Sequence, residues 1–234
     1  MVDITNKLTS GKNSTNIQQR KTKSFGYQVL GFGAGGVVSP FIVATGGTIT
    51  CCGDYKIHTF TGPGTFCVTG GGNPDGSDTV DYMVVAGGGG GGAKTCHNGP
   101  AAAGAGGFRA SATTFCNAGP SSPLTPTCGP TAVAALPVTA QGYAIVVGGG
   151  GAGGLSPPPP GTSASFPGTI GVASSFSTIP SAGGGFGAGA GDPTGSGDGG
   201  SGGGGPGNVD YQPAPAAAGA GNTPPVSPPQ GNPG

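Results

Sequence analysis

The stretch from Val80 to Gly92 constrains the fold most, because a short apolar run leads directly into six consecutive glycines. Its first half contains Tyr82 and the run 83–85, and such aromatic and β-branched residues favour a β-strand. The glycine half disfavours an α-helix, since each Gly destabilises a helix by about 1 kcal/mol relative to Ala. Two structures remain open for it: a flexible linker, or extended polyproline II-type helices that pack against one another.

The packed alternative depends on the missing side chain, because only Gly lets such chains approach closely enough for one backbone to hydrogen-bond another. Glycine tracts recur along the chain, and Tyr143 begins a second apolar run that leads into glycines at 148. This repetition indicates a module rather than random linker. We therefore predict that tracts 87–92, 148–154 and 183–207 are ordered, extended and mutually hydrogen-bonded.

The composition favours a fold that is stabilised by backbone hydrogen bonds more than by the packing of side chains. Gly (56) and Pro (24) make up about a third of the 234 residues, and only 34% of residues are apolar. A conventional core of large apolar residues is therefore unexpected over most of the chain. If the chain is ordered, its buried N–H and C=O groups must bond one another. The predicted fold class is mostly β and extended, with a small antiparallel β unit, a polyglycine II-like body and almost no α-helix.

The charge pattern excludes several functions. Only 7% of residues are charged and the net charge is zero. Five of the eight basic residues lie within the first 23 positions, and none follows Arg109. This pattern argues against nucleic-acid binding, which needs basic residues spread over a face. The apolar stretch 27–45 contains glycines and Pro40, so we expect no membrane insertion. The first residues lack the apolar run of a secretion signal.

Nothing in the sequence predicts catalysis, a metal or a cofactor. There are two histidines and no glutamate, and the eight aspartates are scattered, so we expect no enzyme. Cys96 and His97 are sequence neighbours, which does not make a catalytic pair. The six cysteines show no Cys-x2-Cys spacing for zinc. They are interpreted either as small buried thiols or as one or two disulfides.

The composition shifts along the chain predict three regions. Residues 1–24 are polar and are interpreted as a docking arm, with a disordered terminus as the alternative. Residues 25–86 are expected to form a β-rich anchor domain, with a hairpin over 55–68 and a third strand over 80–86. Residues 87–234 form the glycine- and proline-rich extended body. Aromatic residues in that body are either receptor contacts or packing residues: Phe108, Phe166, Phe176, Phe186 and Tyr211.

Several of these segments resemble the glycine-rich virion structural proteins of tailed bacteriophages, particularly those of marine bacteria. The likeness rests on residues 24–33, on the run 55–66, on 80–92, on 104–109 and on the proline-rich stretch 224–232. It covers about residues 22 to 234. The resemblance implies a tail-fibre or adhesin-like protein whose polyglycine II helices pack as a bundle and whose apical loops contact the host.

The same resemblance implies a location and partners. The protein is expected on the virion surface, reached by host lysis without a signal peptide. Its expected partners are other virion proteins through the N-terminal region, itself as a homo-oligomer (a trimer by analogy with other fibres) and a host surface receptor. The alternatives are a capsid decoration or head-fibre protein, or a purely structural glycine-rich fibre protein without receptor binding.

Overall fold

The β-branched and aromatic runs of the sequence form short strands in a computed structural model, which describes residues 39–93, 99–111, 133–155, 166–189, 194–206 and 217–234. Within these ranges there is no α-helix. The strands are β1 (Ile42–Thr45), β2 (Thr48–Cys52), β3 (Tyr55–Thr59), β4 (Gly64–Gly71), β5 (Thr79–Val80), β6 (Met83–Val85), β7 (Phe108–Ala110), β8 (Leu136–Pro137), β9 (Gly142–Val146), β10 (Ser174–Phe176) and β11 (Ile179–Ser181).

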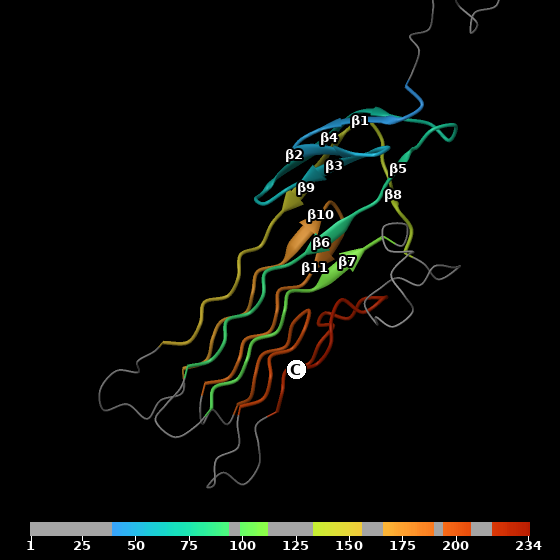
Figure 1. The fold of residues 1–234 in the computed structure, drawn as a ribbon. Helices are drawn as coiled ribbons and strands as arrows, with labels where there is room; N and C mark the ends of the chain where they lie inside the picture. The colour runs from blue at the N-terminus through green and yellow to red at the C-terminus, as the bar shows by residue number, and fades with distance from the viewer. Residues whose placement is uncertain (1–38, 94–98, 112–132, 156–165, 190–193, 207–216) are drawn as a thin grey trace, which may run out of the picture. The chain divides into compact units, whose positions relative to one another are not determined.

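The largest sheet has five strands in the order β1-β4-β9-β10-β11, and its neighbouring strands are antiparallel (Figure 1). Three antiparallel pairs accompany it: β2 with β3, β5 with β8, and β6 with β7. The strand pair β6–β7 packs against β10 and β11 of the large sheet. Strands far apart in the sequence therefore assemble into one β region.

The predicted hairpin over 55–68 is wrong in its pairing. Its first strand, β3, pairs instead with the preceding β2, through the turn Gly53-Asp54. Gly53 has φ of 57°, a left-handed conformation that suits a two-residue hairpin turn. The return strand lies in β4, which pairs with β1 and β9. The third strand is also placed differently, because β6 pairs with β7 and not with the hairpin.

The β region is not confined to the predicted anchor 25–86. Strands β7 to β11 all follow residue 86 and supply part of the sheets. The described residues from Pro40 onward belong to a single compact unit, so the anchor and the body are not separate domains there. The arm 1–24 and residues 25–38 lie outside the described residues.

A small aromatic core occupies the β region. Phe66 of β4 lies 5.9 Å from Phe176 of β10 and 6.4 Å from Tyr143 of β9, measured between ring centroids. Tyr82 contacts Phe176 from the other side, with centroids 6.4 Å apart. The edge-to-face arrangement of such rings adds about 0.5–1.5 kcal/mol per pair to their burial. The core is completed by Ala44, Val68, Val84 and Val138.

Several strands continue directly into extended segments, which we label g1 to g9. Segment g1 follows β6, g2 precedes β7, g3 follows β9, g4 precedes β10 and g5 follows β11. The two sequence modules that begin at Tyr82 and Tyr143 thus give β6–g1 and β9–g3, as the repeat predicts. The segments are g1 (86–93), g2 (99–107), g3 (148–155), g4 (166–173), g5 (182–189), g6 (194–200), g7 (201–206), g8 (217–222) and g9 (230–234).

Hydrogen bonds between these segments recur at every third residue. The N–H groups of residues 86, 89 and 92 in g1 donate to g2, at the carbonyls of 107, 104 and 101. The next register, 87, 90 and 93, donates to g4, at the carbonyls of 172, 169 and 166. A helix of about three residues per turn presents every third group to the same neighbour. Segment g1 also accepts bonds from g3 and g5, so it has bonded neighbours on several sides.

Segment g5 lies at the centre of this bundle, and each carbonyl from 182 to 188 accepts a backbone hydrogen bond. Carbonyls 182, 185 and 188 accept from g2, carbonyls 183 and 186 from g6, and carbonyls 184 and 187 from g4. The N···O distances are 2.7–3.0 Å. This satisfies the requirement that buried backbone groups be paired. The glycine tracts are therefore a packed bundle and not a linker, which confirms the predicted polyglycine II-like body.

The spacing of the segments leaves no room for a side chain at most glycine positions inside the bundle, whereas the small side chain of Ala188 in g5 is fully buried there. A Cβ atom built on Gly185 would overlap the carbonyl oxygen of Gly197, and one on Gly183 would overlap that of Gly171. Outward positions of the outer segments differ, since a Cβ on Gly149 of g3 would meet no atom within 4 Å, whereas one on Gly148 or Gly151 would overlap a carbonyl oxygen of g4. Glycine is thus required by close approach at the positions that face a neighbouring segment.

We expect Gly185→Ala to lower the stability of the protein by about 1–3 kcal/mol, because overpacking a dense interior shifts backbone or side chains. The matched control is Gly149→Ala, which we expect to be neutral or stabilising by about 0.4–1 kcal/mol through reduced freedom of the unfolded chain. Thermal unfolding followed by circular dichroism measures both. Equal melting temperatures for the two variants would contradict the packed bundle.

Two buried serines provide a second test. The hydroxyl of Ser111 accepts from the Tyr82 N–H at 3.1 Å and donates to the Asp81 carboxylate at 2.6 Å. The hydroxyl of Ser181 is equally buried but has no hydrogen-bond partner among the described residues. We expect Ser111→Ala to destabilise by about 1–3 kcal/mol, because it leaves buried polar groups unpaired, and Ser181→Ala to be neutral or stabilising. Urea unfolding midpoints compare the two, and the reverse order would refute this account.

Candidate functional site

The antiparallel course of the segments brings their far ends together, away from the sheets. Ala93 at the end of g1 donates its N–H to the carbonyl of Phe166 at 2.9 Å, where g4 begins. Ala101 in g2 donates to Ala188 in g5 at 3.0 Å. Figure 1 shows these segment ends side by side. We call this region, bounded by Ala93, Leu155, Phe166, Gly189, Thr194, Pro206 and Ala217, the distal end.

Four connections leave from the distal end, g1 to g2, g3 to g4, g5 to g6 and g7 to g8, because g1, g3, g5 and g7 run toward it and g2, g4, g6 and g8 run back. The connecting residues 94–98, 156–165, 190–193 and 207–216 lie outside the described residues. The bundle therefore brings the described ends of g1, g3, g5 and g7, with side chains such as Leu155, to one place. A rigid scaffold that positions residues from different parts of the chain is the arrangement that a recognition surface needs.

Ser196 joins four extended segments near the distal end through hydrogen bonds. Its hydroxyl accepts from the Ala188 N–H at 2.9 Å and donates to the Gly204 carbonyl. Its own N–H donates to the Ala217 carbonyl at 3.1 Å. One small polar residue thus joins g5, g6, g7 and g8. The sequence offered little signal for this role, since Ser196 lies between glycines in a low-complexity tract.

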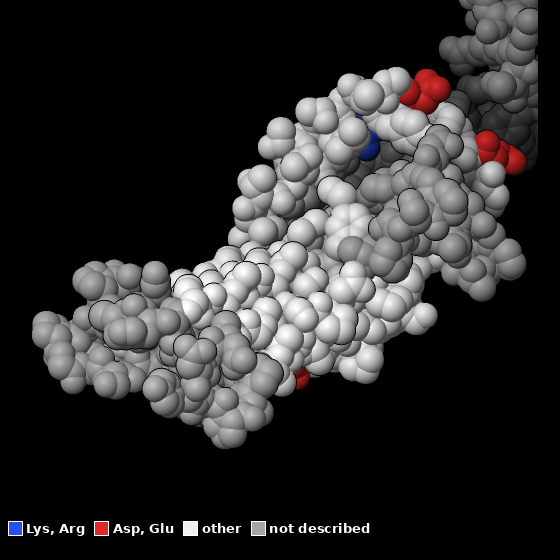
Figure 2. All heavy atoms as spheres, turned by 60° about the horizontal axis from the view of Figure 1, so that its bottom comes forward, with Lys and Arg blue, Asp and Glu red and all other residues white. Residues whose placement is uncertain are grey.

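The bundle is almost without charge. Asp198 is the one charged residue in the described parts of g1 to g9, and its carboxylate accepts from the Ala220 N–H at 2.6 Å. In Figure 2 the described surface of the bundle on that face is white except for one small acidic patch at its lower edge. Exposed apolar side chains do occur, with Leu155 65% exposed at the distal end and Ile170 and Val172 more than half exposed along g4. A surface of this kind offers apolar contact and backbone hydrogen bonds rather than ion pairs.

The C-terminal residues close the other side of the bundle through a side-chain network that the sequence analysis missed. Gln230 is 2% exposed, and its amide accepts from the Ala182 N–H at 2.8 Å and donates to the Pro224 carbonyl at 2.8 Å. Asn222 accepts from the N–H groups of Val226 and Gln230. The signal available was a polar residue at each end of a proline-rich run. These residues hold the C-terminal segment against g5.

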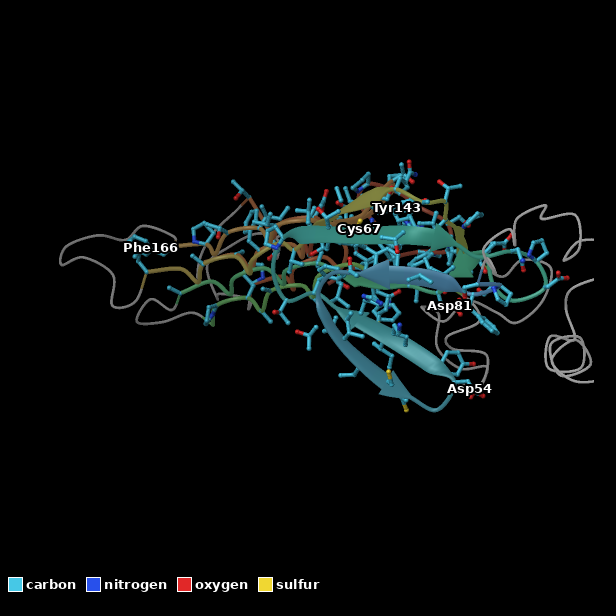
Figure 3. All side chains as sticks on the ribbon, turned by 90° about the horizontal axis from the view of Figure 1, so that it is seen from above. Asp54, Cys67, Asp81, Tyr143 and Phe166 are labelled. Carbon is cyan, nitrogen blue, oxygen red and sulfur yellow. The ribbon has the colours of Figure 1, made fainter. Side chains whose placement is uncertain are left out.

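The predicted aromatic residues do not form one site. Phe176 lies in the core of the β region, and the ring of Phe186 packs over Gly197, where a Cβ would overlap it. Phe108 is half-buried in β7, and its N–H donates to the Gln230 carbonyl at 2.8 Å. Phe166 lies at the distal end, as Figure 3 shows, and is half-buried. Tyr211 lies outside the described residues.

The titratable groups of the β region serve its packing. His58 sits with Nδ1 2.8 Å from the Gly46 carbonyl oxygen and its ring edge-to-face with Phe66. Burial raises the pKa of Tyr82 and so favours the neutral phenol in the core, while the nearby charge of Arg109 has the smaller, opposite effect. The Tyr143 hydroxyl accepts from the Thr139 N–H at 2.7 Å, and this bonding to Thr139 lowers its pKa.

Three of the six cysteines, Cys51, Cys52 and Cys67, lie among the described residues. Cys51 and Cys52 are exposed free thiols on β2 and Cys67 is a half-buried free thiol, so the buried-thiol interpretation is wrong for Cys51 and Cys52, and none of these three forms a disulfide. Cys96, Cys116 and Cys128 lie outside the described residues. Among the residues that are described, no group of three His, Cys, Asp or Glu side chains could hold a metal ion. The same part of the chain contains no helix that could span a membrane.

Comparison with known proteins gives one match. No curated protein and no solved structure matches the chain significantly. The glycine-rich domain family matches residues 60–234, which include every extended segment of the bundle and most strands. Because this match covers well over half of the sequence, the chain belongs to the glycine-rich domain family.

Proposed function

We propose that the protein is a surface structural component of a tailed-phage virion, most specifically a tail-fibre or adhesin component that contributes to host attachment. The observation that carries the proposal is the bundle itself, in which the bonded segments g1 to g8 turn back at one common end. A bundle of this kind holds its distal end at a fixed distance from the β region. The segments that resemble glycine-rich phage virion proteins support the assignment to a particle.

The chemistry of the bundle suits this role better than catalysis. Its interior consists of paired backbone, and its described surface has almost no charge and no cluster of reactive groups. Recognition at the distal end would use apolar side chains such as Leu155 and Phe166 together with the connections that leave there. The N-terminal region is the part that we assign to other virion proteins, and the receptor is a structure on the host surface.

We expect purified protein to bind host cells and to compete with adsorption of the particle. The double variant Leu155→Ala/Phe166→Ala should weaken cell binding by about tenfold or more, because central aromatic and apolar contacts carry most of the energy of an interface. The matched control is Tyr55→Ala/Ile57→Ala, which removes exposed apolar side chains from β3 instead. It should bind cells as the unaltered protein does.

The outcomes of this experiment separate the alternatives. Antibody labelling of particles locates the protein on the tail or on the capsid, and capsid labelling would favour a decoration or head-fibre protein. Labelled particles whose protein neither binds cells nor competes for adsorption would favour a purely structural fibre protein. Absence of the protein from particles would refute the virion proposal altogether.

A further inference from the structure

Segment g3 forms a lateral edge of the bundle and uses only part of its backbone. Its residues 151 and 154 donate to g1, at the carbonyls of Gly88 and Gly91, and its carbonyls 149 and 152 accept from g4. With about three residues per turn, these bonds account for two of the three registers of the segment. The third register consists of Gly150 and Gly153, which neither donate to nor accept from another described residue.

This third register is exposed and carries no side chains. Gly150 and Gly153 are both exposed, and Cβ atoms built on them would meet only ordinary contacts, 3.6 Å from the Gly88 oxygen and 3.7 Å from the Gly91 oxygen. An exposed row of unpaired N–H and C=O groups is a template for pairing with another chain, as at the edge of a β-sheet. The same type of backbone bonds g3 to g1 and g4.

Two other outer segments carry side chains that hinder such pairing. Segment g4 has exposed Pro167 and Ile170 on the register that bonds no other described residue, and g9 has exposed Asn232 and Pro233. Proline offers no N–H, and a branched or polar side chain keeps another backbone at a distance. Segment g3 has no such residue between 148 and 154, where every position is Gly except Ala152.

We propose that the g3 edge binds a second copy of this chain, g3 against g3, so that two bundles join into one. Gly150 and Gly153 can hydrogen-bond another backbone only at close approach. The occupant must therefore be an extended chain that has no side chains at the positions facing them, which recur at every third residue. The g3 segment of a second copy meets that requirement. A two-fold axis makes the pair antiparallel and self-complementary, and antiparallel pairing already joins g3 to g4 within the chain.

The proposal is tested with the double variant Gly150→Pro/Gly153→Pro. Proline suits an extended polyproline II segment, and here it removes only N–H groups that bond no described residue. The fold should therefore persist, which circular dichroism and the melting temperature verify. The matched control is Ala102→Pro/Ala105→Pro, which places two prolines at exposed positions of g2 whose N–H groups are likewise not donors to described residues.

In sedimentation velocity over a concentration series, we expect the unaltered protein and the control to form dimers. The Gly150→Pro/Gly153→Pro variant should have a dimer dissociation constant about tenfold or more higher. Amide hydrogen exchange by NMR should show Gly150 and Gly153 becoming protected as the concentration of unaltered protein rises. A monomer throughout the series, equal association of the proline variant, or dimerisation without protection of these two amides would each overturn the proposal.

Discussion

The structure depends on direct hydrogen bonding between backbones that have no side chains between them. In most proteins the interior is filled by apolar side chains, and burial of their surface is the dominant favourable term. Here the fully buried large apolar side chains are gathered in the β region around Phe66 and Phe176. In the bundle, the carbonyls of g5 from 182 to 188 each accept a bond from g2, g4 or g6. Net hydrogen-bond energies of about 0.5–1.5 kcal/mol are modest singly, so such a bundle needs many of them, in register.

The β region supplies that register. Segments g1, g3 and g5 leave the strands β6, β9 and β11, while g2 and g4 enter β7 and β10. Because the strands are held by an aromatic core, the glycine segments start at fixed spacings and cannot slide past one another. Glycine alone specifies no register, since every position is alike. The side chains of Tyr82, Tyr143 and Phe176 therefore determine the alignment of residues that lie well beyond their own contacts.

The sequence predicted strands and extended segments well, and it predicted which strands pair with one another poorly. The run from Val80 into polyglycine predicted both a strand and a packed extended segment, because residue type restricts local conformation directly. The pairing of strands could not be predicted in the same way. The alternation along Tyr55–Phe60 indicates which side chains share one face of the strand, but it does not indicate which strand lies beside it. The two-residue turn at Gly53-Asp54 was the better hairpin signal. No residue pattern predicted that the segments meet at a distal end, and Ser196 and Gln230 act through contacts that exist only after the chain has folded.

The central position of g5 has a consequence for synthesis. Segment g1 is made early, yet its neighbours g4 and g5 lie some eighty to a hundred residues later in the chain. Segment g2 follows g1 directly, but a ribosome must release most of the polypeptide before the first glycine tract can also bond g4 and g5. Until then part of the backbone of that tract is exposed, the kind of surface that recruits other nascent chains. Because large apolar residues are scarce in the tracts, the nascent chain is less prone to aggregate during this time than one that exposes an unpaired hydrophobic strand.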